Sequence, residues 1–427
     1  MDPIDFKHQI LKHDIQTDAT HNNSAAKDLS KQQGNISGRD ITFDSTALVP
    51  YDPTLPHVSI KTYLEAVTDK AFKDTMALAL YESKHLNYET PLEHRRLCQV
   101  LPPLTGPHLI GRTSFVLDVP NSIVRGSNNK IGIEIFAPTR NVTGNRTLMQ
   151  MLPGYYGVIR SMNPEYTGDP LTAQQSETLH THALDQLDPV EGMPILIFSH
   201  GMSVDPTIYR PLVEELASHG FVVLNLNHPA SSNHAPFSQE ALNEHAWDKL
   251  FSSGMEKVDE EAEKMASTGT ANIQFVVEQI RSEKLSGLPK GCGLTNKIIL
   301  SGHSLGGASS IMATRDNPDI AGCINLDGRL TGTKEKKLAG LAVPVLILSS
   351  ELDPHNKGDK EMLDEFEAFH KNSARSTQKK VEGAKHMDFT MYPMLDWLVG
   401  GTHLKEGLKT HTEASQEMLN FMKAIGK

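Results

Sequence analysis

The sequence contains few cysteines and no pattern in which cysteine would hold a fold together. Its three cysteines, Cys98, Cys292 and Cys323, are far apart and odd in number. They therefore suggest neither a disulfide framework nor a zinc motif, and we expect reduced thiols. Glycine and proline are ordinary in number: 31 and 24 among 427 residues exclude a collagen-like or low-complexity architecture.

The sequence also lacks an excess of basic residues. It has 41 Lys and Arg against 52 Asp and Glu, a net charge of −11, without a basic stretch. A chain this acidic is a poor candidate for binding nucleic acid through its overall field, and we expect no nucleic-acid partner.

Long apolar runs are missing as well. The longest, Leu338–Leu348, has eleven residues and is interrupted by Pro344, which suits a buried strand and is too short to span a bilayer. The first residues carry charges throughout and lack an apolar core of signal-peptide length. We therefore expect a soluble protein with a cytoplasmic location.

Three regions differ in composition. Residues 1–50 are polar and rich in Asn, Gln, Asp, Lys and Ser, which predicts a mobile N-terminal extension. In residues 51–103 the apolar positions have helical spacing, so this region is predicted to be a helical accessory segment. Residues 104–427 are predicted to form the main domain, for which a chain with 38% apolar residues can supply a core.

Within the main domain, continuous apolar runs alternate with helical patterns. The run before Pro120 and the run Lys130–Pro138 are expected to pair as antiparallel strands. Further strands are predicted at residues 194–201, 221–229, 297–304, 323–327, 343–353 and 379–382, and helices at 209–218, 271–283, 306–315, 360–370 and 415–424. Such alternation is typical of a parallel sheet buried on both faces. The sequence thus predicts an α/β fold with a mostly parallel central sheet, helices on both faces and a lid-like helical insertion at residues 231–269.

The strongest local signal is Gly302-His303-Ser304-Leu305-Gly306. This G-x-S-x-G motif directly follows the apolar run 298–300 and precedes a predicted helix. A serine nucleophile needs a sharp strand-to-helix turn that exposes its hydroxyl, and flanking glycines remove side chains that would clash there. The following helix directs its first amides at developing negative charge. The motif makes Ser304 the candidate nucleophile; the alternative is a Gly-rich turn with an incidental serine.

A serine nucleophile needs a base, and the base needs an orienting carboxylate, in the chain order Ser, Asp or Glu, His. Five histidines follow the motif: His355, His370, His386, His403 and His411. His386 lies in a loop after the last predicted strand, where it can reach the serine, and is our candidate base. His370, His403 and His411 are expected on solvated faces.

Two residues are candidates for the acid. Asp327 ends the predicted strand 323–327, and Asp353 ends the predicted strand 343–353. Both lie at carboxyl ends of strands, where the sites of α/β proteins are built. An aspartate at a strand end can equally be a turn or helix-capping residue. Chain order does not choose between the two.

His200-Gly201-Met202 follows another predicted strand. In the architecture that this serine turn implies, such a loop supplies one oxyanion amide, and the amide after the nucleophile, that of Leu305, supplies the other. Two such donors typically matter by about a few kcal/mol in the transition state. His200, His228 and His303 are themselves expected to be structural hydrogen-bonding residues.

Several segments together resemble the platelet-activating factor acetylhydrolase family, of the monomeric α/β-hydrolase type that includes plasma and isoform II-like members. They are the stretch 194–232, GHSLGG at 302–307, INLDG at 324–328 and EGAKHMDFT at 382–390. The likeness runs from about Leu104 to Pro393. It implies an α/β-hydrolase fold for a catalytic domain at residues 104–427.

The resemblance also implies site residues. The family's triad acid maps onto Asp327, its base onto His386, and its oxyanion amides onto Met202 and Leu305. It therefore favours Asp327 over Asp353. The chain departs from the family beside the nucleophile and after the triad aspartate, where the family often has bulky aromatic residues and this chain has leucine and Gly-Arg. The departures leave the acyl-chain and head-group preference open.

These observations predict a serine esterase that hydrolyses short-chain carboxylic esters through a Ser-His-Asp triad and an acyl-enzyme. The sn-2 acyl group of platelet-activating-factor-like phospholipids is the substrate class that the resemblance implies, and no metal or organic cofactor is required. One alternative is another α/β-hydrolase reaction, of the dienelactone, carboxylesterase or polyester type. The other is a catalytically silent lipid-binding module. The expected partner is a small-molecule ester or phospholipid.

The predicted insertion bears on substrate access. Leu242, Ala246, Trp247, Leu250 and Phe251 have a spacing compatible with an apolar helix face. Such a face more often packs on the core. The alternative is transient contact with a membrane surface.

Overall fold

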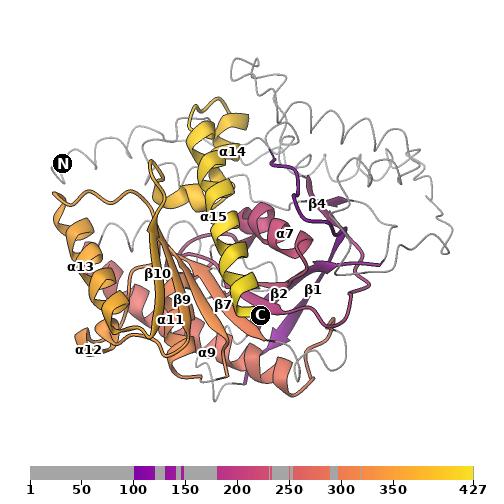
Figure 1. The fold of residues 1–427 in the computed structure, drawn as a ribbon, viewed down its shortest axis with the longest axis horizontal. Coiled ribbons are helices and arrows are strands. Elements are labelled where there is room, and N and C mark those ends of the chain that lie inside the picture. The colour runs from indigo at the N-terminus through magenta and orange to yellow at the C-terminus, as the bar shows by residue number, and fades with distance from the viewer. Residues whose placement is uncertain are drawn as a thin grey trace, which may run out of the picture. The chain divides into compact units, whose positions relative to one another are not determined.

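A computed structural model describes residues 101–426, apart from 121–129, 141–145, 149–179, 230, 233–249, 251–252, 289–296 and 318. Its centre is a ten-stranded sheet in the order β10-β9-β8-β7-β5-β6-β2-β1-β4-β3. Figure 1 shows this sheet with helices in front of it and behind it. The predicted extension (1–50) and nearly all of the predicted accessory segment (51–103) lie outside the described residues.

One half of the sheet is parallel. Its strands are, in chain order, β5 (Ile195–Ser199), β6 (Val222–Asn227), β7 (Ile298–His303), β8 (Gly322–Leu326), β9 (Pro344–Ser349) and β10 (Arg375–Lys380). Alternate side chains of β5 enter two different cores: Leu196 and Phe198 pack on one face, and Ile195 and Ile197 on the other. This burial on both faces explains the unbroken apolar runs of the sequence.

The other half of the sheet is largely antiparallel. β1 (Ile110–Asp118) and β2 (Lys130–Pro138) form the expected hairpin, with Ile110 opposite Pro138 and Asp118 opposite Lys130. β2 pairs antiparallel with β6, so the hairpin extends the parallel half directly. Two short strands that the sequence did not predict, β3 (Arg146–Leu148) and β4 (His180–Leu184), continue the sheet beyond β1.

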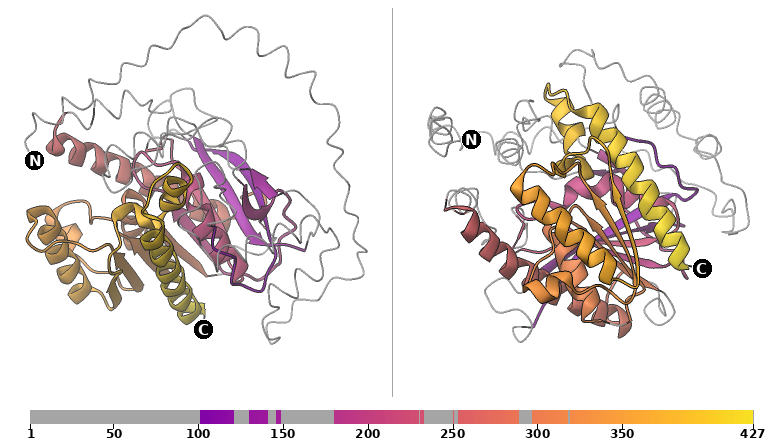
Figure 2. Two further views of the ribbon diagram at one scale, coloured as in Figure 1. Left: turned by 90° about the horizontal axis from the view of Figure 1, so that it is seen from above. Right: turned by 60° about the vertical axis from the view of Figure 1, so that its left-hand side comes forward.

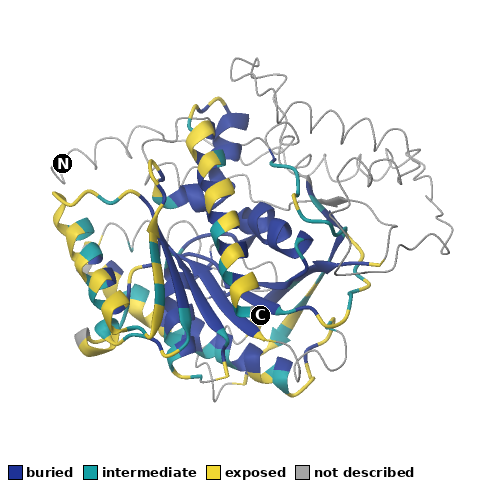
Figure 3. Cartoon of the chain, in the orientation of Figure 1, coloured by how far each residue is buried: buried dark blue, intermediate teal, exposed yellow. Residues whose placement is uncertain are grey.

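Helices cover both faces of the sheet, as predicted. On one face, α7 (Arg210–Ser218), α14 (Tyr392–Leu398) and α15 (Leu404–Gly426) share a core with the strands. On the other face lie α9 (Met255–Arg281), α11 (Leu305–Arg315) and α13 (Lys357–Asn372), with the short α12 (Lys334–Leu338) beside α13. Figure 2 shows the two helix layers from two further directions, and Figure 3 shows the buried strands between them. No helix in the described ranges is long and apolar enough to cross a membrane.

The chain order around β5 determines where a site can form. From β5 the chain enters β6 on one side and later β7 on the other, so β5 lies at a reversal of strand order. In open α/β sheets, ligands bind in the crevice outside the carboxyl ends of the strands at such a reversal. Here those ends lead into the loop 200–202 after β5 and into Ser304 after β7.

Three predicted elements have clearly different limits in the structure. The C-terminal helix predicted at 415–424 is α15, which begins at Leu404. The helix predicted at 271–283 is α9, which begins at Met255. The prediction missed its first half because that acidic segment has too few apolar residues to reveal helical spacing. The last strand, predicted at 379–382, is β10, whose largely exposed polar side chains show no apolar alternation. Residues 233–249, most of the first half of the predicted insertion, lie outside the described residues, and its second half forms the beginning of α9. The lid-like character and the apolar face of the insertion therefore stay predictions.

Candidate active site

Ser304 stands on a sharp turn between β7 and α11. Its backbone has φ 54° and ψ −122°, and it caps the N-terminus of α11. Residues other than glycine rarely adopt positive φ, so the surrounding structure must hold this conformation. A Cβ at Gly302 or Gly306 would overlap backbone atoms of the turn itself or of Ser199. The turn therefore packs too closely for a side chain at either position, which is the physical basis of the motif.

Asp327 directly follows β8, the strand beside β7, and also has a positive φ of 52°. Its buried carboxylate accepts a hydrogen bond from the Ser350 amide at 2.7 Å, and its Oδ2 lies 2.6 Å from His386 Nδ1. Burial would raise the pKa of Asp327, but the hydrogen bond and charge of His386 and the Ser350 amide outweigh it and lower the pKa. Asp327 is therefore ionised near neutral pH and accepts the Nδ1 proton of His386.

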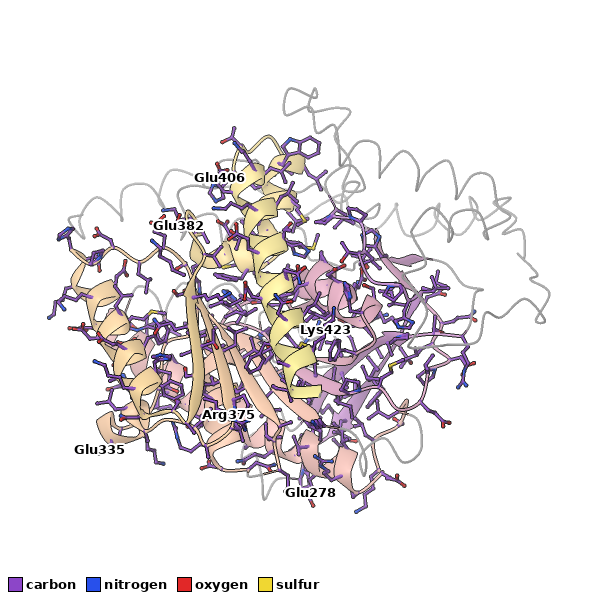
Figure 4. All side chains as sticks on the ribbon, in the orientation of Figure 1. Glu278, Glu335, Arg375, Glu382, Glu406 and Lys423 are labelled. Carbon is purple, nitrogen blue, oxygen red and sulfur yellow. The ribbon has the colours of Figure 1, made fainter. Side chains whose placement is uncertain are left out.

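His386 begins the 3₁₀ helix η5 (His386–Phe389), which follows β10. Figure 4 labels Arg375 and Glu382 at opposite ends of the segment that carries β10, and His386 comes four residues after Glu382. The His386 side chain is 43% exposed, whereas that of Asp327 is 2% exposed. The imidazole thus stands between a buried carboxylate and solvent, where a substrate can reach it.

His386 also lies against the residue that precedes Ser304. The ring centroids of His303 and His386 are 4.5 Å apart, and His303 Nε2 is 2.9 Å from the His386 carbonyl oxygen. Within the described residues, no hydrogen bond joins the Ser304 hydroxyl to the His386 ring. Hydrogen bonds of this kind are often long without substrate and tighten in the reacting complex.

Two backbone amides near Ser304 have no acceptor among the residues that the structure describes. In the part of the chain that the structure describes, the N–H groups of Met202 and Leu305 donate no hydrogen bond. Leu305 is the first residue of α11, where amides lack partners within the helix. The loop with Met202 lies close to the serine turn, since a Cβ at Gly201 would be 3.2 Å from the Ser304 Cβ. Both amides are therefore free to donate to a bound oxygen.

His200 and His228 form a buried pair behind this loop. His200 Nδ1 is 2.7 Å from the Gly201 carbonyl oxygen, and its Nε2 accepts from the His228 amide at 3.0 Å. Burial lowers the pKa of His200 to about 4, and burial and the neighbouring His200 lower the pKa of His228 well below its usual value. Both rings are therefore uncharged near neutral pH and act through hydrogen bonds alone.

The remaining titratable candidates lie elsewhere. Asp353 is exposed and accepts a hydrogen bond from the His355 amide at 2.8 Å, as a turn aspartate does. His355 and His370 are exposed. The expectation of solvated faces is wrong for two histidines that pack around α15: His403 lies 3.0 Å from a buried carboxylate of η5, and His411 is buried. Among the described residues, no three His, Cys, Asp or Glu are grouped as a metal site requires.

The structure adds Tyr209, which the sequence did not mark as a site residue. Its hydroxyl, at the end of the 3₁₀ helix η4 (Pro206–Tyr209), accepts from the Gly201 amide at 3.2 Å and lies 2.8 Å from His303 Nδ1. In the sequence, Tyr209 is an aromatic residue at the start of an amphipathic helix, where a core position is usual. Nothing in the sequence distinguishes a tyrosine that makes these two hydrogen bonds from one that only packs in the core.

Comparison with known proteins bears on the resemblance seen in the sequence. A family model for platelet-activating factor acetylhydrolase, isoform II, matches residues 99–279. The resemblance is confirmed over this segment. The segment includes Met202 and ends before Ser304, so the candidate nucleophile, acid and base follow it in the chain.

Three curated relatives are platelet-activating factor acetylhydrolases. That of Cavia porcellus is 22% identical over 246 residues, which are 54% of this chain and 56% of that protein. Those of Canis lupus familiaris and Bos taurus are 24% and 25% identical over 180 and 189 residues, in each case 38% of this chain and 40% of the relative. The chain thus matches about half or less of the length of these relatives.

A solved structure with a similar fold is the ferulic acid esterase from Streptomyces cinnamoneus. It has a TM-score of 0.53 at 19% identity, covering 76% of this chain and 91% of that one. At this identity the likeness concerns the fold. With β5 placed between β6 and β7 in a mostly parallel sheet, the chain has the α/β-hydrolase fold, as predicted.

Proposed function

We propose that this protein is a serine ester hydrolase for short-chain carboxylic esters, with the sn-2 acyl group of platelet-activating-factor-like phospholipids as its substrate class. The observation that carries the proposal is the 2.6 Å contact of His386 Nδ1 with the buried Asp327, beside a serine on a strained strand-to-helix turn. Ser304 is the nucleophile, His386 the base and Asp327 the orienting acid. The family resemblance of residues 99–279 supports the same chemistry.

Acylation starts with a proton transfer. In the neutral His386 ring the Nδ1 proton is donated to ionised Asp327, which leaves Nε2 as the nitrogen that takes the proton of Ser304. Ser304 Oγ bonds to the ester carbonyl carbon, and the carbonyl oxygen becomes an anion. The Nε2 proton then passes to the alkoxy oxygen of the leaving group while the ester C–O bond breaks, which leaves an acyl-enzyme.

Deacylation repeats these steps with water. Water gives one proton to His386 Nε2 and bonds to the acyl carbon, which forms a second oxyanion. The bond from that carbon to Ser304 Oγ breaks, Oγ receives the proton from Nε2, and the carboxylic acid leaves. Asp327 stabilises the charged imidazole in both halves of the reaction.

The oxyanion is stabilised by the amides of Met202 and Leu305. Within the described residues neither amide has another acceptor, and Leu305 stands at the N-terminus of an eleven-residue helix. The helix end adds a partial positive charge, which favours an anion there. Loss of one such donor typically lowers the rate by about 10²–10³-fold.

Replacement of the nucleophile tests this reaction. Ser304→Ala is expected to abolish labelling by a fluorophosphonate probe and to lower p-nitrophenyl acetate hydrolysis by about 10⁴-fold or more. Ser309→Ala is the matched control, because Ser309 lies in the same helix and its hydroxyl donates to the Leu305 carbonyl at 2.9 Å. Wild-type labelling and hydrolysis by Ser304→Ala would overturn the proposal.

A substrate panel tests the ester class. Phospholipids with a short sn-2 acyl group should be hydrolysed with a higher kcat/KM than soluble aromatic esters or polyester fragments, with products identified by mass spectrometry. Preference for the soluble esters would assign another α/β-hydrolase reaction. A folded wild-type protein that neither hydrolyses any ester nor reacts with the probe would instead fit a lipid-binding module. Co-sedimentation with phospholipid vesicles tests the transient membrane contact.

A further inference from the structure

Tyr209 lies beneath the candidate site with its hydroxyl among polar groups of separate segments. Its side chain is fully buried, with ring centroids 5.0 Å from Phe198 and 5.7 Å from His303. The hydroxyl accepts a hydrogen bond from the Gly201 amide at 3.2 Å and lies 2.8 Å from His303 Nδ1. His303 Nε2 in turn lies 2.9 Å from the carbonyl oxygen of His386. A chain of hydrogen bonds thus runs from Gly201 to His386.

Chemistry determines the direction of each hydrogen bond in this chain. A carbonyl oxygen only accepts, so His303 Nε2 carries the proton and donates to His386. In the neutral ring Nδ1 is then bare and accepts from the Tyr209 hydroxyl. Burial and the neighbouring His386 lower the pKa of His303 to about 3, and burial raises the pKa of Tyr209. Neither group therefore changes its protonation state near neutral pH.

This series of hydrogen bonds connects three residues next to or within the proposed catalytic machinery. Gly201 precedes the first proposed oxyanion amide, His303 precedes the nucleophile, and His386 is the proposed base. Gly201 and His386 lie outside the strands, so the sheet alone does not fix their separation. We propose that Tyr209 and His303 are positioning residues that hold the loop 200–202 and the His386 ring at a set distance from Ser304. This inference rests on the proposed function.

The physical reason is that two buried polar groups depend on one hydroxyl. Without the Tyr209 hydroxyl, the Gly201 amide and His303 Nδ1 lose their partner, and a buried group without a partner is costly. The loop or the ring then shifts to find another partner. Displacement of a reacting group by about 1 Å can lower a rate by about 10²-fold. Because the shift affects transition-state geometry more than substrate binding, kcat should respond and KM should not.

The first test is Tyr209→Phe, which keeps the buried ring and removes the hydroxyl. With p-nitrophenyl acetate, kcat per fluorophosphonate-titrated site is expected to fall about tenfold, with KM within twofold of the wild type. The matched control is Thr314→Val, which removes a buried hydroxyl that bonds the Ser310 carbonyl at 2.7 Å near the far end of α11. A kcat for Tyr209→Phe within twofold of this control would overturn the proposal.

The second test separates position from packing at His303. In His303→Gln the side-chain amide can occupy the place of Nε2 and donate to the His386 carbonyl, whereas His303→Leu fills space without a donor. We expect kcat of His303→Leu to be about 100-fold below that of the wild type. The kcat of His303→Gln should be about tenfold higher than that of His303→Leu. Equal kcat values per titrated site in the two variants would overturn the role of this hydrogen bond.

A third measurement does not depend on catalysis. The short hydrogen bond of His386 Nδ1 to Asp327 should give a downfield proton resonance, which can be followed in the inactive Ser304→Ala background. Adding Tyr209→Phe should broaden this resonance and speed its exchange with water, whereas Thr314→Val should not. An unchanged resonance would overturn the positioning role even in an active enzyme. A wild-type protein without esterase activity whose resonance responds as expected would contradict the proposed function alone.

Discussion

Glu134 is a buried carboxylate whose contribution to stability can be worked out from its surroundings. It lies on β2, with Oε1 2.6 Å from Arg210 Nη2 and 2.8 Å from Arg112 Nε, and its Oε2 accepts from Asn225 at 3.2 Å. The Glu134 side chain is 13% exposed and that of Arg210 is 4% exposed. Because Arg210 directly follows Tyr209, this cluster also anchors the beginning of α7 beneath the candidate site.

The magnitude follows from the pKa of this carboxyl group. Burial would raise the pKa of Glu134, but Arg210 and Arg112 outweigh it and lower the pKa from 4.5 to about 2. A carboxylate with a depressed folded-state pKa stabilises the fold above its unfolded-state pKa. The lowering of the Glu134 pKa from 4.5 to about 2 corresponds to about 3–4 kcal/mol of stability, since each pKa unit is about 1.4 kcal/mol. This stability is present at pH 7 and is lost as the pH falls from 4.5 to about 2.

Glu134→Gln tests this reasoning. It removes the carboxylate charge beside buried Arg210, and breaking a buried pair typically costs about 3–5 kcal/mol. We expect a lower urea midpoint at pH 7 and a shallower decline of the midpoint between pH 4.5 and 2. The control is Asp364→Asn, which breaks an exposed 2.9 Å pair with Lys360 and should cost less than about 1 kcal/mol. Equal midpoints for the two variants would refute the reasoning.

Three further predictions concern the site. Asp327→Asn should lower kcat about 10⁴-fold, because an amide neither fixes the Nδ1–H tautomer of His386 nor stabilises the charged ring. Asp353→Asn should leave kcat unchanged. Similar mild losses of kcat in both variants would remove Asp327 as the acid. Gly306→Ala should abolish fluorophosphonate labelling, since its Cβ would overlap the Ser199 carbonyl, and wild-type labelling would contradict this packing. Burial lowers the pKa of His200 from 6.5 to about 4. The stability of the fold should therefore fall as the pH drops from 6.5 towards 4, because the unfolded chain binds the proton more readily. Constant urea midpoints at pH 7, 6 and 5 would contradict an uncharged His200.

The sequence was sufficient to predict the buried part of the sheet. β5 to β9 appear as runs rich in apolar residues because both of their faces are covered. The polar residues within β6 and β8, such as Asn225 and Asn325, are themselves buried. The predicted strand for β10 started four residues and ended two residues too late, because β10 pairs with β9 at the edge of the sheet and presents polar side chains. The first half of α9 was not recognised as one helix with the second for a similar reason: a mostly exposed, acidic segment carries little apolar periodicity.

The site could be predicted only in part. Ser304 was recognisable because the turn excludes side chains at two fixed positions, which leaves a motif in the sequence. Asp327 and Asp353 both follow strands, and only the resemblance to a family separated them before the 2.6 Å contact of Asp327 with His386 was known. Tyr209 could not be found, because its partners come from segments around residues 201 and 303 that meet only in the folded chain.

The segment that carries His386 is attached to the outermost strand of the parallel half. Among the described residues, β10 has one neighbouring strand, β9, and its own side chains face water or are only partly covered. Such an edge opens locally at a lower free energy than the interior does. Gentle heating or dilute denaturant should therefore displace the His386 imidazole while the interior strands remain folded. Loss of activity should then precede global unfolding, because it follows the local opening of β10.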